Sequence, residues 1–232
     1  MLRTSPRPRI QRDQGAEHFR DALRRRARPA PLQGLLAGTC GAFAEVASMA
    51  MELLAAPYLT RENGGFYTEA EAARARLDVL RSIITFWPYM AMIDALQHWI
   101  YEHEDEAADL ERCDDAWVTL MDRFRPAFDW SGLDAEKRAS WHQQSHVFTD
   151  PFYYIEYGIA QLGAVQVWTN ALRDQAGAVA AYRKALALGG TATLPDLYAT
   201  AGAQFAFDTD TLRAAVELVE REMARLEPVA AA

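Results

Sequence analysis

The sequence has little cysteine, almost no lysine and no long apolar run. Two thiols, Cys40 and Cys113, cannot form a disulfide framework or a four-thiolate zinc site, and they are compatible with a reducing compartment. No uncharged stretch is longer than residues 157–172, which contain three side-chain amides and fall short of the roughly 20 apolar residues that cross a bilayer. We therefore expect a cytoplasmic protein with no transmembrane helix and no membrane partner.

Basic and acidic residues are unevenly divided along the chain. Residues 1–40 carry nine arginines against three acidic residues, and they lack the apolar region of a secretory signal. Residues 41–232 carry 15 basic and 29 acidic side chains, a balance of −14. We predict a basic, disordered segment at 1–40 and a folded unit at 41–232. The acidic balance of this unit argues against a nucleic-acid partner.

Alternating β-branched residues are nearly absent, and apolar residues recur at the spacing of helices. Thr68 and Glu71 have the spacing of a capping box. Proline disfavours helix in the residue before it, so a break or kink is expected at Pro88. Asp150 followed by Pro151 is typical of a helix start. We predict an all-α fold with no significant sheet and about eight helices, over residues 43–54, 68–87, 89–102, 110–124, 134–145, 152–172, 176–188 and 210–226.

Two histidines have the spacing of a helical zinc motif. His142 and His146 stand at positions i and i+4, but Gln143 occupies the place of the glutamate that acts as the base in that motif. A carboxamide cannot accept a proton from zinc-bound water. Taken alone, the pair is either a degenerate zinc motif or, as the simpler alternative, two surface histidines on a polar helix.

Three further clusters place polar side chains beside apolar ones. Glu45 and Glu52 are seven residues apart and hence on one helical face, which is most simply a solvated flank. Asp94, His98 and Tyr101 share a face of another predicted helix, where Asp94 could orient His98, although such a pair is equally common in ordinary packing. The third cluster lies near the start of the helix at 152–172 and is either aromatic core or a set of hydroxyls that need partners: Tyr153, Tyr154 and Tyr157.

Four separated stretches carry a resemblance to a known family. They read AFAEVASMAMELL at 42–54, WPYMAMIDALQHW at 87–99, HVFTDPFYYIEYGIAQLG at 146–163, and LGG followed by LPDLY within 188–198. Together they resemble the C-terminal catalytic half of oligoendopeptidase F, a branch of the thimet oligopeptidase family of zinc metallopeptidases. The resemblance covers about residues 42–227, in order.

The resemblance implies an active site for cleaving short peptides inside a channel between helical lobes. Such enzymes use one zinc, held by the two histidines of a His-Glu-x-x-His helix and by a glutamate on a following helix, and Glu45 matches that glutamate. His146 and Tyr153 resemble the groups that hold the scissile carbonyl and stabilise its developing negative charge. The residues that resemble further substrate contacts are Tyr154, Tyr157 and His98.

One departure from the family is specific. The resemblance places the His-Glu-x-x-His helix near residues 15–20, where this chain reads GAEHFR, so the two zinc histidines and the general base are missing. The abrupt change of composition near Gly41 suggests a frameshift, a wrong start codon or a gene remnant. A separate N-terminal half is then a candidate partner.

We therefore expect the C-terminal fragment of a zinc-dependent metalloendopeptidase. The intact family would hydrolyse oligopeptides, whereas this chain alone is expected to be inactive and not to retain zinc, because one carboxylate cannot replace three ligands. The alternative is a non-catalytic helical module that binds peptides or a partner protein through the exposed half of the channel.

Overall fold

The computed structural model describes residues 41–232, and the predictions made for residues 1–40 lie outside the described residues. Within this range the chain is all-α and without a sheet, as predicted, apart from one isolated bridge between Thr60 and Tyr67. The α-helices are α2 (Gly41–Ala55), α3 (Glu69–Glu102), α4 (Glu104–Ala107), α5 (Leu110–Phe124), α6 (Asp134–Ala139), α7 (Ser145–Thr149), α8 (Tyr154–Ala171), α9 (Gln175–Leu188), α10 (Leu194–Thr200) and α11 (Thr209–Ala230). Short 3₁₀ turns lie at η1 (Ala56–Tyr58), η2 (Arg61–Asn63), η3 (Ser140–Gln143) and η4 (Gly189–Thr191).

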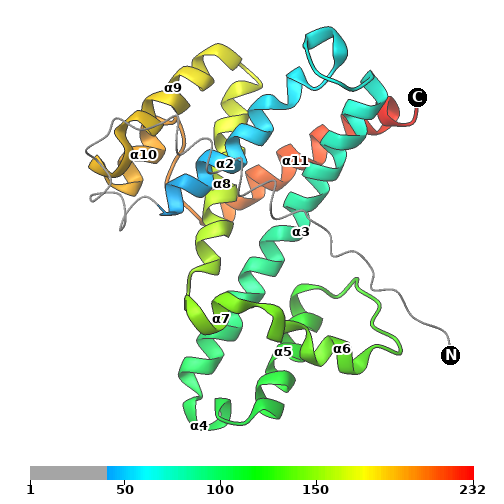
Figure 1. The fold of residues 1–232 in the computed structure, drawn as a ribbon, viewed down its shortest axis with the longest axis vertical. Helices are drawn as coiled ribbons and strands as arrows, with labels where there is room; N and C mark the ends of the chain where they lie inside the picture. Colours follow the sequence, from blue (N-terminus) through cyan, green and yellow to red (C-terminus); the bar gives the residue numbers. More distant parts are fainter. Residues whose placement is uncertain (1–40) are drawn as a thin grey trace, which may run out of the picture.

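The core is divided into two hydrophobic clusters joined by α3 (Figure 1). The first is built by α2, α8, the first half of α3 and the C-terminal helices α9, α10 and α11. The second is built by the second half of α3 with α5, η3 and α7. Helix α3 therefore runs from one cluster into the other, and in Figure 1 it forms the long diagonal that links the upper and lower parts of the molecule.

Helix α3 begins where the capping box predicts, but it does not break at Pro88. Thr68 and Glu71 exchange the two reciprocal hydrogen bonds of a capping box. Of the break or kink expected at Pro88, the break is wrong, because the helix continues through the proline to Glu102, whereas the kink stays a prediction. Interior proline costs about 3 kcal/mol, and burial on both sides outweighs it. Ile83 is buried in the first cluster and Met92 in the second.

The same helix bears on the expectation that the chain has no transmembrane helix. By length and composition alone, α3 could cross a bilayer, since one 18-residue stretch has a mean hydropathy of 1.2. The prediction from uncharged stretches overlooked it because Asp94 interrupts the apolar run. In the structure α3 packs against α5, α8 and α11, and 33% of the apolar stretch is buried.

The start of α8 differs from the prediction. Asp150 and Pro151 were expected to cap and open the helix, but they lie in a turn, and the first helical residue is Tyr154. Phe152 has φ 62°, a left-handed conformation that interrupts a right-handed helix. The Asp150 carboxylate accepts a hydrogen bond from the hydroxyl of Thr149 and caps no backbone N–H in the described structure.

The segment predicted as one polar helix at 134–145 is also divided. It forms α6, the 3₁₀ turn η3 and the first residue of α7. The interruption coincides with contacts from α5. The indole of Trp117 on that helix donates hydrogen bonds to the Lys137 carbonyl (3.1 Å) and to the Ser140 hydroxyl (2.7 Å). Both acceptors lie where α6 passes into η3, so tertiary contacts replace the regular helical pattern there.

Helices α2 and α8 pack side by side, and two hydrogen bonds hold α9 to the same α2. The Tyr182 hydroxyl donates to the carbonyl of Ala47 (2.7 Å), and the Gln175 amide donates to the carbonyl of Leu54 (2.9 Å). Ala47 and Leu54 lie seven residues apart, so α2 is fixed at two points along its length.

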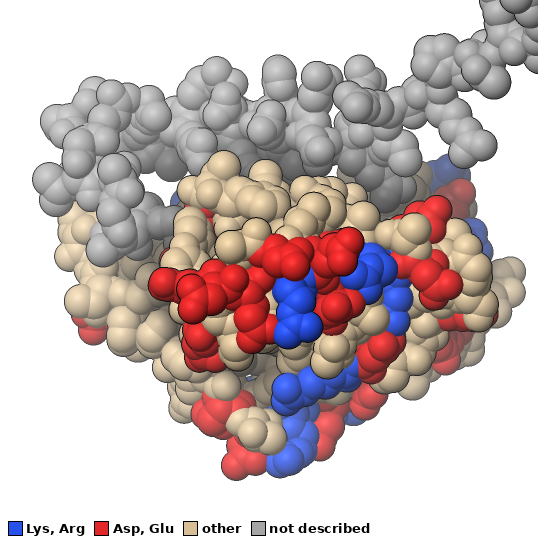
Figure 2. Space-filling model, turned by 90° about the horizontal axis from the view of Figure 1, so that it is seen from below, with Lys and Arg blue, Asp and Glu red and all other residues tan. Residues whose placement is uncertain are grey.

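Acidic side chains gather at the end of the molecule formed by α4 (Figure 2). The α4 sequence contributes Glu104, Asp105 and Glu106, and ion pairs join Arg112 to Glu106 and Arg138 to Asp115. Such surface pairs contribute little stability each. A predominantly acidic face repels a phosphate backbone.

Candidate functional site

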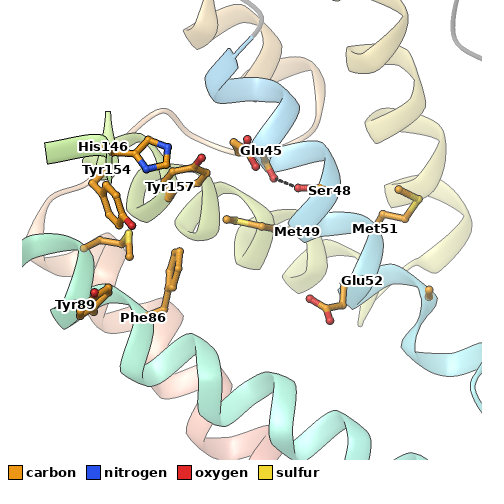
Figure 3. A pocket seen from close by; sticks show the side chains of 12 residues that line it. Glu45, Ser48, Met49, Met51, Glu52, Phe86, Tyr89, His146, Tyr154 and Tyr157 are labelled. Atoms are coloured by element: carbon orange, nitrogen blue, oxygen red, sulfur yellow. Dashed lines mark hydrogen bonds between the residues drawn. The ribbon is translucent and has the colours of Figure 1, made fainter. Parts of the chain in front are cut away.

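A cavity of about 830 Å³ lies where α2, α3, α7 and α8 meet (Figure 3). Most of its wall is apolar, with polar groups contributed by three separate segments of the chain. Twelve residues line it: Glu45, Ser48, Met49, Met51, Glu52, Ala55, Phe86, Tyr89, Met90, His146, Tyr154 and Tyr157. A cavity of this size and composition is suited to hold a small molecule or several residues of a peptide.

The α2 wall supplies the negative charge of the cavity. Glu45 and Glu52, which the spacing alone placed on a solvated flank, both line it. Ser48, between them, donates its hydroxyl proton to the Glu45 carbonyl (3.0 Å; Figure 3). Partial burial raises the pKa of the Glu52 carboxyl above its usual value. Glu52 therefore holds its proton more strongly than an exposed glutamate.

Opposite α2, the ring of His146 sits among three tyrosines. The ring of Tyr153 is stacked on it, with centroids 5.7 Å apart and planes 10° from parallel. Tyr154 and Tyr157 meet it edge-on, at 5.1 and 6.2 Å. The Tyr154 hydroxyl donates to the side-chain carbonyl of Gln144. These contacts fix the orientation of the imidazole on α7 by packing from the first turn of α8.

Glu45 is electrostatically coupled to this aromatic cluster. Burial raises the pKa of Tyr153, and the negative charge of Glu45 raises it further, while a hydrogen bond with Tyr157 acts in the opposite direction. The pKa of Glu156 is raised in the same way, first by burial and then by Glu45. Tyrosines with raised pKa values remain protonated near neutral pH, so their hydroxyls are hydrogen-bond donors.

The structure brings four of the six predicted site residues to the cavity wall: Glu45, His146, Tyr154 and Tyr157. Tyr153 contacts the site through the rings of His146 and Tyr157 and does not itself line the cavity. His98 lies elsewhere. Its ring packs on Phe152, 5.0 Å between centroids, and its Nε2 is 3.6 Å from the carboxylate of Asp94, as the shared helical face predicted.

The other histidine of the degenerate zinc motif, His142, also lies away from the cavity. His142 lies on η3 and His146 on α7, so the helix that would place them on one face is interrupted between them. The Nε2 of His142 is 3.0 Å from the carboxylate of Asp114, which also accepts a hydrogen bond from the indole of Trp141. His142 therefore belongs to a polar cluster on α5 and η3.

Sequence reasoning missed the third wall of the cavity. Phe86, Tyr89 and Met90 line it from α3, and they surround the proline at which a break was expected. Their spacing of three and four residues is that of one helical face. With a continuous helix assumed through Pro88, the same spacing would have grouped them.

The described residues do not by themselves fit a catalytic zinc ion, which takes three protein ligands. Within residues 41–232, no group of three His, Cys, Asp or Glu side chains is close enough to hold a metal. Glu45, Glu52 and His146 share one cavity without forming such a group. Among the described residues, Glu45 therefore lacks the partners that a metal site needs.

Several solved structures have a similar arrangement of helices. The structure of PZ peptidase A with an inhibitor is 25% identical in sequence to this chain and matches it with a TM-score of 0.71. The matched region covers 79% of this chain and 32% of the PZ peptidase A chain. A structure assigned as oligoendopeptidase F has 31% identity and a TM-score of 0.69, covering 79% of this chain and 31% of its own. An oligoendopeptidase F from Bacillus anthracis str. Ames, at 24% identity, TM-score 0.62 and coverages of 81% and 29%, shows the fold alone. The fold is that of a helical peptidase lobe.

The chain belongs to peptidase family M3, whose sequence model matches residues 37–217. The family predicted from the four sequence stretches is thereby confirmed. A search of curated proteins found no match. The chain spans about a third of the length of the solved structures it matches.

Proposed function

We propose that this chain forms one wall of the peptide-binding channel of a zinc-dependent metalloendopeptidase that acts on short peptides. The observation that carries the proposal is the meeting of Glu45 on α2 with His146 and its tyrosines in one cavity, although about a hundred residues of sequence separate them. Family membership supports the peptide as substrate.

In this proposal each side chain has a distinct role. Glu45 supplies one carboxylate ligand to zinc, an ion that activates water and polarises a carbonyl when it is bound. His146 donates a hydrogen bond to the oxygen of the scissile carbonyl, and Tyr153 donates a second one. Each such donor contributes on the order of 3 kcal/mol when negative charge develops on that oxygen. Tyr153 does not itself line the cavity, but its ring contacts those of His146 and Tyr157, which do, and this contact supports its role beside His146.

Tyr154 and Tyr157 are proposed to contact the bound peptide, since both line the cavity. His98 was expected to join them, but its packing on Phe152 gives it no place in the cavity wall. We therefore do not carry His98 into the proposed site.

The chain alone is proposed to lack activity, because Glu45 offers a single metal ligand where three are needed. Equilibrium dialysis of the purified chain should find no stoichiometric zinc, and peptidase assays should find no turnover. One tightly held zinc per chain would contradict the proposal and return attention to His142 and His146.

Complementation tests the roles directly. A separately made family segment bearing His-Glu-x-x-His, mixed with or fused to this chain, should produce peptidase activity that chelators remove. In that assembly Glu45→Gln should lose zinc, because a neutral amide is a poor ligand. His146→Ala and Tyr153→Phe should keep zinc and lower turnover, since they act on the developing charge.

Glu52→Gln is the matched control for the metal, because it removes the other carboxylate of the same cavity. It should leave the zinc content unchanged. Loss of zinc in the His146 variant, or unchanged turnover in both donor variants, would refute the assigned roles. An assembly that binds peptides but never cleaves them would favour the alternative of a non-catalytic peptide-binding module.

A further inference from the structure

A second, smaller cavity adjoins the candidate active site. Its volume is about 350 Å³, and Phe86 and Tyr89 line both cavities, so the two are neighbours along α3. Their charges are opposite. Glu45 and Glu52 line the first, whereas Arg125, the residue after the last turn of α5, is the one charged residue among those described as lining the second.

The guanidinium of Arg125 lies over two aromatic rings. It lies 3.8 Å from the centroid of the Phe128 ring and 5.4 Å from that of the Tyr89 ring. Cation–π contacts of this kind orient the planar group without using its N–H donors. The donors of Arg125 are therefore available in a fixed position.

No acidic group among residues 41–232 is paired with Arg125 in the structure. The two acidic residues nearest to it in sequence are engaged elsewhere. Asp122 pairs with Lys137, and Asp129 accepts hydrogen bonds from the backbone and hydroxyl of Ser131. A half-buried arginine without a counter-ion among the described residues can offer its N–H donors to an anion from solution.

Some hydrogen-bond donors of the second cavity already have acceptors within the protein, and others do not. Ser82 and Ser140 donate to backbone carbonyls, at 2.7 and 2.8 Å. The indole Nε1 of Trp130 is buried and has no acceptor among the described residues. Burial raises the pKa of Tyr89 to about 12, so its hydroxyl keeps its proton near neutral pH. Arg125, Tyr89 and Trp130 thus form a set of donors that matches an acceptor-only group.

We propose that Arg125, with Tyr89 and Trp130, binds the C-terminal carboxylate of a peptide whose preceding residues occupy the first cavity. The inference rests on the proposed function, since it assumes that a peptide lies there. A carboxylate has two acceptor oxygens and suits the fork of a guanidinium. The site would select short peptides with a free C-terminus over internal segments of longer chains.

Calorimetric titration of the whole chain with matched peptides tests the inference without needing activity. The probes are an N-acetylated, uncharged pentapeptide with a free C-terminus and the same peptide with a C-terminal amide. The amide should bind about tenfold more weakly, as expected for the loss of a charge-assisted hydrogen bond. Arg125→Gln should bind both peptides with the same affinity as the wild type binds the amide.

Arg123→Gln is the matched control, because Arg123 is exposed on the same helix, lies over the ring of Phe124, and lines neither cavity. It changes the net charge by the same amount as Arg125→Gln, and it should keep the tenfold difference in affinity between the free acid and the amide. A third peptide, amidated and ending in glutamate, separates the two sources of a carboxylate. If it binds as tightly as the free acid, a side chain is recognised and the assignment to the C-terminus is wrong.

The outcomes also separate this inference from the function on which it rests. Equal affinity of the wild type for acid and amide would overturn the carboxylate site and leave the peptide channel standing. Binding of neither peptide would overturn both. The indole N–H signal of Trp130 gives a second readout in the wild type, because it should shift with the free acid and stay in place with the amide. A Trp130 signal that responds equally to both peptides would contradict the inference even if Arg125→Gln fails to fold.

Discussion

Replacing Gly163 of α8 by alanine should destabilise the protein, although alanine is the better helix former. A Cβ atom at this position would lie 2.5 Å from Cε1 of Tyr198, a separation that real side chains do not show. Tyr198 is 1% exposed and cannot retreat easily, since its hydroxyl donates to the carbonyl of Ile159 at 3.2 Å and its ring meets those of Phe43 and Phe205 edge-on.

The size of the effect follows from two opposing contributions. Glycine to alanine in a helix interior gains about 0.5–1 kcal/mol, whereas overpacking a filled core costs about 1–3 kcal/mol. Gly163→Ala should therefore lose about 0.5–2 kcal/mol of unfolding free energy. At Gly158, on the same helix, the new Cβ would meet only Met90, at 3.4 Å. That is an ordinary van der Waals distance, so Gly158→Ala should gain about 0.5–1 kcal/mol.

Urea unfolding followed by far-UV circular dichroism measures both variants against the wild type. The same substitution on the same helix should move the midpoint in opposite directions, with the slope unchanged. Equal stabilisation of both variants would refute the reasoning, because it would show that α8 and α10 separate at little cost. In that case the close approach of Tyr198 to the helix that carries the site tyrosines would not be a constraint.

Three further predictions concern α3 and the cavity. Pro88→Ala should raise the unfolding free energy by about 1–2 kcal/mol, because it restores a backbone donor for the carbonyl of Ile84, and a shift of the urea midpoint measures it. Gln97→Met should raise it by about 1–3 kcal/mol in the same assay, since the buried Gln97 amide has no hydrogen-bond partner among the described residues. The raised pKa of Glu52 means that the folded state binds its proton more tightly than the unfolded state, so stability falls as pH rises from about 4.5 through the folded pKa. Glu52→Gln should accordingly be more stable than the wild type at pH 7 and equal to it at pH 4, as thermal unfolding at the two pH values will show.

Local sequence signals predicted the helices well where the signal lies within a few residues. The spacing of Thr68 and Glu71 located the start of α3, and the helix at 110–124 has the predicted limits. The signals failed where distant packing decides. Pro88 is tolerated because two clusters bury α3 on either side of it. Asp150 and Pro151 do not open α8 because Phe152 adopts a left-handed conformation against His98 and Tyr101.

The candidate site was predicted in part, and for a different kind of reason. Glu45, His146, Tyr154 and Tyr157 were identified by resemblance to a family, and the structure brings these four to one cavity. Periodicity alone could not have joined them, because nothing in the spacing of α2 indicates which part of α8 it will face. The contributions of Tyr89 and Arg125 depend on how α3 and α5 meet.

The continuity of α3 has a consequence for how the molecule opens. Its first half belongs to one hydrophobic cluster and its second half to the other, and Pro88 removes one hydrogen bond from the ladder between them. Cooperative units of a protein exchange their amide protons together. The amides of α3 should therefore fall into two groups with separate protection factors, divided near Pro88. A transient opening of the part of the molecule that contains α5 would widen the cavity around Arg125, while α2 and α8 stay packed around Glu45. The continuous helix α3 therefore allows the two cavities to open independently.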